Sequence, residues 1–390
     1  DPLWSRGLGD VYKRQPIDTP ALLLDSARMM RNIADMQQRM DSLGVAFRPH
    51  AKTSKSPQVV QRQLEAGARG ITVSTLKEAE QFFAAGVDDI LYAVAIVPSK
   101  FEHAGRLIQA GLRLTLLVES AEGARALSDF GRTRGLVLPV LVEIDTDGHR
   151  SGIAPDSPML LEVARAFSHD AQGGAELHGV LTHAGSSYGL RTDAALAALA
   201  EQERAGCVRA AERLRAAGWP CPVVSVGSTP TALRARALDG VTEVRAGVYV
   251  FFDLVMAGVG VCALDDIALS VLCTVIGHQP EAGRLITDAG WMAMSRDRGT
   301  QKQAHDHGYG LVCDAQGQAI PQLAFNDANQ EHGVLQWTGD PGTDLARRFP
   351  LGSTLRIVPN HACATGAQHA AYTVSRPDGG HESWPRFNGW

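Results

Sequence analysis

Lys52 is the residue in this sequence that is best suited to covalent chemistry with a carbonyl group. It follows Val45–Arg48, an apolar run with the composition of a short strand, and it stands in the polar stretch His50-Ala51-Lys52. A lysine that is partly desolvated, or close to cations such as His50 and Lys55, can have a lowered pKa and form a Schiff base. Most lysines are solvated surface groups, so position alone leaves the ordinary interpretation open.

Two polar segments, Gly-Ser-Thr-Pro at 227–230 and Arg-Ala-Gly-Val-Tyr at 245–249, each follow a strand-like apolar run. Loop amides, hydroxyl groups and helix N-termini at such positions bind phosphate groups. Each segment could equally be an ordinary turn or helix start, but their joint placement favours an anion site. The candidate residues are Ser228, Thr229, Gly247 and Tyr249.

Two further loops carry groups that could contact an aromatic cofactor. Asp145–Arg150 places carboxylates and a guanidinium after one apolar run, and Thr182–Tyr188 follows the next. Arg150 or Tyr188 could hydrogen-bond a ring nitrogen or a phenolic oxygen. The alternatives are a capped turn with a surface ion pair and a simple polar loop.

His361 and Cys363 form a candidate metal pair. Residues i and i+2 of an extended strand point to the same face, and imidazole plus thiolate suits a borderline-soft divalent metal such as zinc. Only two ligands are visible, so water or substrate would complete the coordination. The commoner alternative is a buried cysteine beside a hydrogen-bonded histidine. Asp297, Glu331 and His332 have no role that the sequence assigns.

Alternating strands and helices must position these groups. Apolar runs predict strands at 45–48, 70–73, 90–94, 114–118, 138–144, 177–181, 223–226 and 241–244, with helices between most of them. Thr75 and Glu78 form a capping box that begins one helix. This pattern predicts an α/β fold with a (β/α)8 TIM barrel. A doubly wound open sheet is the rival, but a barrel gathers the polar groups that recur at the strand ends: Lys52, Ser74, Glu119, Asp145, His183, Ser228 and Arg245.

The rest of the chain lacks the alternation of strands and helices. After about Gly260, short β-rich runs such as 268–276, 284–287 and 354–358 predict a separate β domain. We expect the barrel over residues 26–260, the β domain over 261–390, and a strand within 16–25 that joins the β domain. Residues 1–15 lack any period, and 10–15 are typical of a translated sequencing adaptor, so we expect them to be foreign to the fold.

Composition excludes several classes of protein. The 390 residues include 37 Lys and Arg against 42 Asp and Glu, a net charge of −5, so there is no basic excess for nucleic acid. A hydrophobic fraction of 45% and a charged fraction of 20% exclude disorder. No apolar run approaches the roughly 20 residues of a membrane helix. Six scattered cysteines and no visible secretory signal favour a reducing cytoplasm.

Several motifs, in order, resemble one known group. These motifs are Arg-Pro-His-Ala-Lys-Thr at 48–53, Asp-Gly-His-Arg at 147–150, Gly-Ser-Thr-Pro at 227–230, Ala-Gly-Val-Tyr-Val-Phe-Phe-Asp at 246–253, Asn-Gln-Glu-His-Gly at 329–333 and Asn-His-Ala-Cys at 360–363. Together they resemble the fold-type III pyridoxal phosphate enzymes, in the branch of D-serine dehydratases and D-threonine aldolases. The similarity runs from about Ile17 to Trp390.

The resemblance implies an alanine-racemase-like barrel with a β domain, usually a homodimer. It implies that Lys52 forms the Schiff base with pyridoxal 5'-phosphate, and that His361 and Cys363 bind a divalent metal. The other cofactor-contacting positions that it implies are His50, Arg150, Tyr188, Ser228, Thr229, Gly247 and Tyr249. A His-x-Cys pair is similar to the dehydratases, whereas the aldolases carry His-x-Asp; a thiolate suits zinc, with manganese, cobalt or nickel also open.

The implied reaction is a carbon–oxygen lyase reaction on a D-3-hydroxy amino acid, with D-threo-3-hydroxyaspartate giving oxaloacetate and ammonia. Alternatives are D-serine dehydration to pyruvate, retro-aldol release of glycine and an aldehyde, and racemisation, for which no opposite-face base is visible. A non-catalytic pyridoxal phosphate carrier is the rival from another class. The long β-rich segment after Gly260 argues against a carrier, because carriers are typically a lone barrel.

Overall fold

A computed structural model describes residues 17–167, 174–376 and 380–390. The segment expected to be foreign, 1–15, lies outside the described residues. The chain divides into two units. We call them the barrel unit (Asn32–Tyr249, Val259–Val261 and Phe387–Trp390) and the β unit (the described residues up to Arg31, Val250–Gly258 and Cys262–Arg386).

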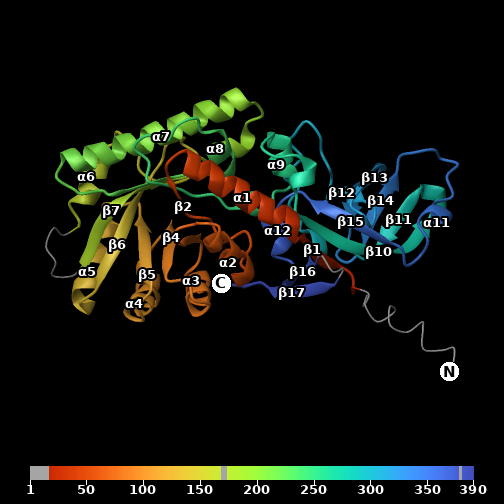
Figure 1. Ribbon diagram of the computed structural model, residues 1–390, viewed down its shortest axis with the longest axis horizontal. Helices are drawn as coiled ribbons and strands as arrows, with labels where there is room; N and C mark the ends of the chain where they lie inside the picture. The colour runs from red at the N-terminus through yellow and green to blue at the C-terminus, as the bar shows by residue number, and fades with distance from the viewer. Residues whose placement is uncertain (1–16, 168–173, 377–379) are drawn as a thin grey trace, which may run out of the picture. The chain divides into compact units, whose positions relative to one another are not determined.

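Parallel strands alternate with helices along the barrel unit (Figure 1). All the strands predicted there from the sequence are present, with ends that differ by a few residues. The strands are β2 (Ala46–Phe47), β3 (Ile71–Val73), β4 (Asp89–Ala95), β5 (Arg113–Val118), β6 (Val137–Ile144), β7 (Gly174–Thr182), β8 (Val223–Val226) and β9 (Glu243–Val244). The main helices are α2 (Pro57–Glu65), α3 (Leu76–Ala84), α4 (Phe101–Gln109), α5 (Ala121–Arg134), α6 (Met159–Ala164), α7 (Asp193–Ala216) and α8 (Thr229–Arg234).

The two edges of the 8-stranded sheet meet. Its order is β2-β9-β8-β7-β6-β5-β4-β3. His50 forms a parallel bridge with Thr72, and the Ala51 N–H donates to the Thr72 carbonyl at 2.8 Å while the Thr72 N–H donates to the Pro49 carbonyl at 2.8 Å. The predicted barrel is therefore confirmed against the open-sheet rival. Closure also places the chain just before Lys52 in the barrel wall.

Leucines from four neighbouring strands pack against one another in this unit. Leu91 on β4, Leu117 on β5, Leu141 on β6 and Leu181 on β7 form one buried cluster, which holds these strands together. The predicted capping box is confirmed: the Thr75 side chain accepts from the Glu78 N–H, and the Glu78 side chain accepts from the Thr75 N–H. The cap therefore fixes the start of α3.

The β unit is built around a 9-stranded sheet of order β11-β14-β13-β12-β15-β10-β1-β16-β17. β1 lies inside this sheet, antiparallel to β10 and parallel to β16. The strands are β1 (Ala21–Asp25), β10 (Leu269–Gln279), β11 (Arg284–Thr287), β12 (Gly310–Cys313), β13 (Ala319–Ala328), β14 (Gly333–Trp337), β15 (Thr354–Pro359), β16 (Ala371–Ser375) and β17 (His381–Pro385). Its helices are α9 (Leu254–Val259), α10 (Trp291–Met294), α11 (Leu345–Arg348) and α12 (Ala362–Gly366), while α1 (Ser26–Ser42) follows β1.

The last residues of the chain belong to the barrel unit. The Phe387 N–H donates to the Lys55 carbonyl at 2.7 Å, and the Phe387 ring packs edge-on against Phe82 with centroids 5.2 Å apart. The Lys55 ammonium lies 5.7 Å from the ring centroid of Trp390. This segment therefore holds the residues that directly follow the Lys52 turn.

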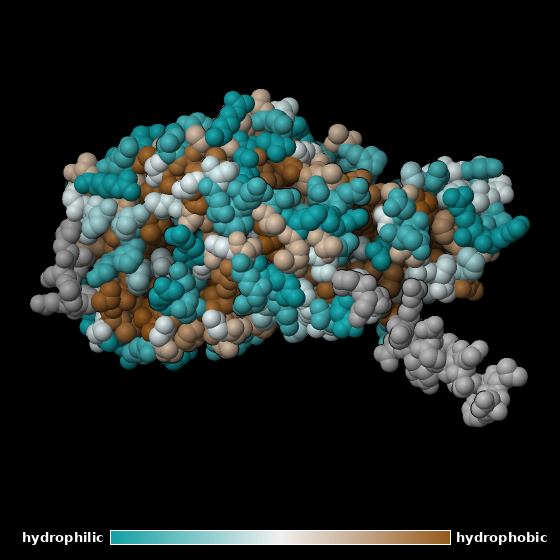
Figure 2. Space-filling view, in the orientation of Figure 1, coloured by the Kyte–Doolittle hydropathy of each residue, from teal (hydrophilic) through white to brown (hydrophobic). Residues whose placement is uncertain are grey.

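The visible surface is predominantly hydrophilic, and brown, apolar atoms lie in small separate areas (Figure 2). Exposed large apolar side chains such as Val97, Met159 and Leu351 are scattered along the sequence. Within the described ranges, no helix is both long enough and apolar enough to cross a bilayer.

Candidate active site

Lys52 lies in a turn that its neighbours hold firmly. Thr53, Ser54 and Ser56 are buried, whereas the Lys52 side chain is exposed. Lys55 has a φ of 45°, in the left-handed region that non-glycine residues seldom adopt. The Lys55 ammonium pairs with the buried Glu78 carboxylate at 3.1 Å. The turn is thus fixed on one side by the N-terminus of α3, while the Lys52 side chain stays accessible.

Positive charge gathers at this end of the barrel. Burial, followed by the charges of Lys52 and Arg245, lowers the pKa of His50 well below its ordinary 6.5. Burial and the same charges lower the pKa of His183 to about 3, although a hydrogen bond to the Gly227 carbonyl opposes the shift. Arg150 acts on both histidines as well. Both imidazoles are therefore neutral at physiological pH, while the remaining cations favour an anionic ligand.

Arg245 stands at a predicted strand end and begins the segment 245–249 that we expected to bind an anion, but the sequence assigned this side chain no role of its own. It is buried, its Nε donates to Ser225 Oγ at 2.9 Å, and its Nη2 donates to the Thr182 carbonyl. Ser225 Oγ in turn donates to Glu243 at 2.7 Å, and Glu243 pairs with Arg48 at 2.9 Å. This chain of contacts fixes the arginine, whose charge acts on both histidines.

The predicted anion loops come together. Ser228 caps α8, and its Oγ lies 3.0 Å from Ser187 Oγ. Thr229 accepts from the Tyr249 N–H at 3.2 Å, which links this loop to the segment after β9. A Cβ on Gly247 would lie 2.9 Å from Thr53 Oγ1 and 3.1 Å from the His50 carbonyl. Glycine at 247 therefore allows the anion segment to lie directly against the Lys52 turn.

Glu203 on α7 is a second residue that sequence reasoning missed. Its Oε1 accepts from the Ala184 N–H at 2.9 Å and from the Gly227 N–H at 3.1 Å. Burial raises the pKa of this carboxyl above its ordinary 4.5. Glu203 thereby ties the loop before Tyr188 to the loop before Ser228. A glutamate in a long helix, two residues from the exposed Glu201, carries no sequence signal for such a role.

Arg150 and Tyr188 lie at the rim. Arg150 is exposed, close enough to act on His50 and His183 electrostatically. The Tyr188 ring, 36% exposed, lies with its centroid 6.2 Å from that of His183. Both side chains therefore remain accessible beside the histidines, as a cofactor-contacting role requires.

The Tyr249 side chain, unlike those of Arg150 and Tyr188, is buried and already hydrogen-bonded. Its side chain is 1% exposed, its hydroxyl accepts from Gln63 Nε2 at 2.7 Å, and its ring packs against Phe47. Burial raises the pKa of this phenol. The phenol is occupied inside the barrel wall, so we expect Tyr249 to act at the anion loops through its main chain alone.

In the β unit, the metal candidates lie at the start of α12. The expectation that His361 and Cys363 lie along one extended strand is wrong: β15 ends at Pro359, His361 is the N-cap of α12, and Cys363 lies in its first turn. The two side chains are nevertheless adjacent, because His361 hydrogen-bonds Cys363. The helical turn, rather than strand alternation, brings them together.

Asp297 supports the histidine. His361 Nδ1 lies 2.6 Å from Asp297 Oδ2, which orients the ring and leaves Nε2 for a metal. Burial disfavours the charged imidazole, but hydrogen bonds to Asp297 and Cys363 outweigh it and raise the pKa of His361 to about 11. Asp253, also buried, accepts from the Ala362 N–H at 2.9 Å. The surroundings of this pair therefore stabilise positive charge.

These two donor sets fit the groups that the resemblance implied. A lysine beside cations, hydroxyl groups and a glycine cradle suits a phosphorylated carbonyl compound. An imidazole oriented by a carboxylate, next to a thiol, suits a divalent metal of the zinc type. In the described part of the chain no group of three or more His, Cys, Asp or Glu side chains is arranged around a metal position. Water or substrate would therefore complete the coordination.

Two protein families cover the chain almost end to end. Residues 24–255 match the alanine racemase N-terminal domain, and residues 268–375 match a putative serine dehydratase domain. D-threo-3-hydroxyaspartate dehydratase from Delftia sp. (strain HT23) is 62% identical over 96% of this chain and 98% of its own length. D-serine dehydratase from Dictyostelium discoideum is 30% identical over 93% of this chain and 94% of its own length.

Solved structures of a D-threo-3-hydroxyaspartate dehydratase have the same fold as this chain. A cysteine-to-alanine variant described as metal-free superposes with a TM-score of 0.93 at 62% identity, covering 96% of this chain and 98% of the other. A histidine-to-alanine variant gives 0.94 at 60% identity, covering 97% and 98%. The two substituted positions are two residues apart in that enzyme. The chain belongs to the family that joins an alanine racemase N-terminal domain to a serine dehydratase domain.

Proposed function

We propose that this protein is a pyridoxal phosphate- and divalent metal-dependent dehydratase that converts D-threo-3-hydroxyaspartate to oxaloacetate and ammonia. The observation that carries the proposal is the adjacent pair His361 and Cys363 with Asp297 behind it. Its His-x-Cys spacing equals that of the histidine and cysteine substituted in the structures of the similar dehydratase. Identity of 62% over 96% of the chain supports the same substrate.

Bound pyridoxal phosphate would supply an electron sink for the carbanion at the substrate α-carbon. Lys52 Nζ is the group that would hold the cofactor carbonyl and, when released by substrate, accept the α-proton. The turn that carries Lys52 is fixed by the Lys55–Glu78 pair, so the amine is presented from a rigid support. Ser228, Thr229 and the Gly247 main chain would bind the phosphate.

Because the two histidines are neutral, the positive charge around Lys52 comes from the arginines. Because the pKa values of His50 and His183 are lowered, neither ring adds a positive charge that competes with Arg150 and Arg245 for carboxylates. Arg150 and Tyr188, both accessible, would contact the cofactor ring or its substituents. Arg245 holds its place through Ser225 and the Thr182 carbonyl, and contributes a fixed positive potential.

A divalent metal on His361 and Cys363 would act as a Lewis acid toward the departing β-hydroxyl group. Asp297 holds the imidazole Nδ1 proton, which keeps Nε2 as the ligating atom. Zinc fits the thiolate best, and manganese, cobalt and nickel are the alternatives to be compared.

The test is keto acid release from D-threo-3-hydroxyaspartate by purified protein with pyridoxal phosphate, with and without a chelator. We expect oxaloacetate formation that the chelator abolishes and added metal restores. Lys52→Ala should lose the imine absorbance of the bound cofactor together with activity, and Cys363→Ala should keep the cofactor but lose turnover. Substantial turnover by Lys52→Ala, or a fully active Cys363→Ala, would overturn the respective assignment.

The matching serine dehydratase domain supports one alternative substrate, D-serine, which would give pyruvate and ammonia. Ratios of kcat/KM for the two substrates decide between them. Glycine and an aldehyde as products would instead identify an aldolase.

We also propose a homodimer in a reducing cytoplasm, without a nucleic-acid or membrane partner. All six cysteines are free thiols in the structure, as expected under reducing conditions. Light scattering of the purified protein tests the dimer, and a monomeric mass with full activity would contradict it.

A further inference from the structure

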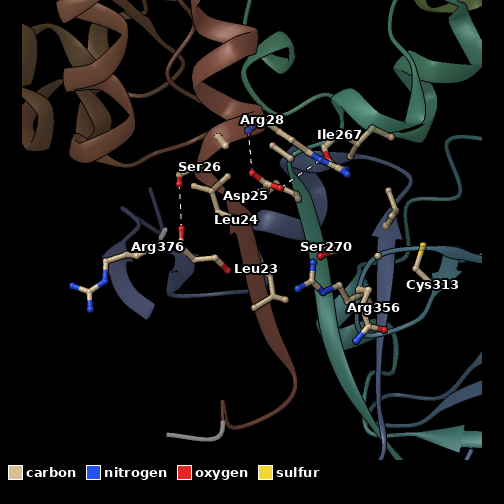
Figure 3. Close-up of a pocket in the computed structure, with 17 residues that line it drawn as sticks. Leu23, Leu24, Asp25, Ser26, Arg28, Ile267, Ser270, Cys313, Arg356 and Arg376 are labelled. Carbon is tan, nitrogen blue, oxygen red and sulfur yellow. Dashed lines mark hydrogen bonds and ion pairs between the residues drawn. The ribbon is translucent and has the colours of Figure 1, made fainter. Parts of the chain in front are cut away.

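A cavity of about 430 Å³ lies within the β unit (Figure 3). Neither His361 nor Cys363 is among the residues that line it. β1, the first turn of α1, β10, β15 and the turn after β12 form its walls. Its lining is mixed: Leu23, Ile267 and Val358 are among the apolar residues, and Asp25, Arg28 and Arg356 are among the charged ones. A volume of this size matches a small metabolite.

The two arginines differ in how their charge is compensated. Arg28 pairs with Asp25 at 3.4 Å and with Asp265 at 3.7 Å, and it donates to the Ile267 carbonyl at 3.1 Å. Arg356 is half-buried, and its Nε is buried without a hydrogen-bond partner among the described residues. No ion pair to Arg356 occurs within those residues either. A buried guanidinium N–H without an acceptor costs free energy that a bound anion would recover.

The geometry directs this unpaired charge into the cavity. Figure 3 shows the Arg356 side chain extending from β15 toward Ser270 on β10, whereas Arg376 points away on the other side of β1. Arg28 and Arg356 both act electrostatically on the Cys313 thiol, so their positive fields overlap at one wall. The N-terminus of α1, a 17-residue helix, also lines the cavity through Ser26 and Ala27, and Asp25 accepts there from the Arg28 N–H at 3.0 Å.

We infer that this cavity is a binding site for a small aliphatic carboxylate, held by the Arg356 guanidinium with its hydrocarbon chain against the apolar side chains of the lining. One uncompensated guanidinium matches one carboxylate, which it can bind through two parallel hydrogen bonds. A phosphate dianion would bring a second negative charge, and Arg28 is already paired. The site is independent of the proposed catalytic reaction, because none of its residues is assigned to that reaction.

The experiment titrates butyrate into the holoenzyme by calorimetry, with inorganic phosphate as the competing anion. The variant Arg356→Met removes the charge and keeps the apolar stem. Arg284→Met is the matched control, because Arg284 is an exposed arginine of the same sheet that bonds Gln336 instead. We expect saturable butyrate binding whose Kd rises about 10–100-fold in Arg356→Met and is unchanged in the control.

Binding of butyrate at the catalytic site would persist in Arg356→Met, so equal Kd values in the two proteins would overturn the inference. Absence of saturable binding would overturn it too, as would tighter binding of phosphate than of butyrate with the same dependence on Arg356. Thermal unfolding without ligand adds an independent measurement. Removing an uncompensated charge should leave the Tm of Arg356→Met equal to or above that of the unaltered protein. A clear fall in Tm would mean that Arg356 serves the fold instead of a ligand.

Discussion

Replacing Glu203 should loosen two loops of the barrel site at once. One oxygen of this buried carboxyl accepts the N–H groups of Ala184 and Gly227. Glu203→Ala leaves both donors buried without an acceptor, at about 1–3 kcal/mol each. We therefore expect a loss of roughly 2–6 kcal/mol in the free energy of unfolding, together with weaker cofactor binding. Glu203→Gln keeps an oxygen where Oε1 stands and should lose far less.

The assay combines urea unfolding with absorbance titration of pyridoxal phosphate. Glu201→Ala is the control on the same helix, because Glu201 is exposed and pairs only at the surface with Arg204 at 2.6 Å; such pairs contribute about 0–1 kcal/mol. We expect Glu203→Ala to raise the Kd for the cofactor at least about tenfold, equivalent to 1.4 kcal/mol, with Glu201→Ala unchanged. Equal behaviour of the alanine and glutamine variants at position 203 would refute the reasoning.

The same residue makes a pH prediction. Because the native pKa of Glu203 is raised above its ordinary 4.5, the folded protein holds a proton that the unfolded chain has lost between the two values. Its contribution to stability therefore falls as the pH rises through that window. Glu203→Gln should flatten this part of the stability curve, and an unchanged curve would contradict the assignment.

Three other perturbations have defined outcomes. Asp297→Asn removes the carboxylate that orients the metal-binding imidazole, so metal affinity should fall about 10–100-fold in a chelator competition, and unaltered affinity would argue against the site. Gly247→Ala should push on the Lys52 turn through its 2.9 Å approach to a threonine hydroxyl, so cofactor affinity should fall more than Tm; a fall in Tm alone would point to general misfolding. Phe387→Ala removes a half-buried ring from α3 and should cost about 1–3 kcal/mol in urea unfolding, with Phe387→Leu recovering part of it; no loss would show that the segment is not held there.

The periodic part of the fold was predictable from the sequence, since strand alternation and capping are local properties. The strand ends near Lys52, His183 and Ser228 were predicted because strands and helices alternate regularly along the chain. In such an alternation the carboxyl ends of the parallel strands meet at the same end of the barrel. The helical turn at Cys363 was not predicted from the sequence. The helix α12 has only five residues, which is too few to show a helical period that would distinguish it from a continuation of β15. Neither Glu203 nor the partner role of Asp297 could be predicted, since both depend on contacts between segments far apart in sequence.

The place of β1 inside the sheet of the β unit governs how the chain can fold during synthesis. Leu23 pairs with Ser270 on one side and with Thr373 on the other. β1 is made long before β10 and β16 and must wait for both, and such non-local pairing is slow. The barrel strands from β3 to β9, by contrast, each pair with the strand next to them in sequence and can form while the ribosome is still translating, whereas β2 must wait for β9. Until β16 emerges, β1 presents an unpaired apolar edge, so a chaperone that shields residues 21–25 should raise the yield of folded protein.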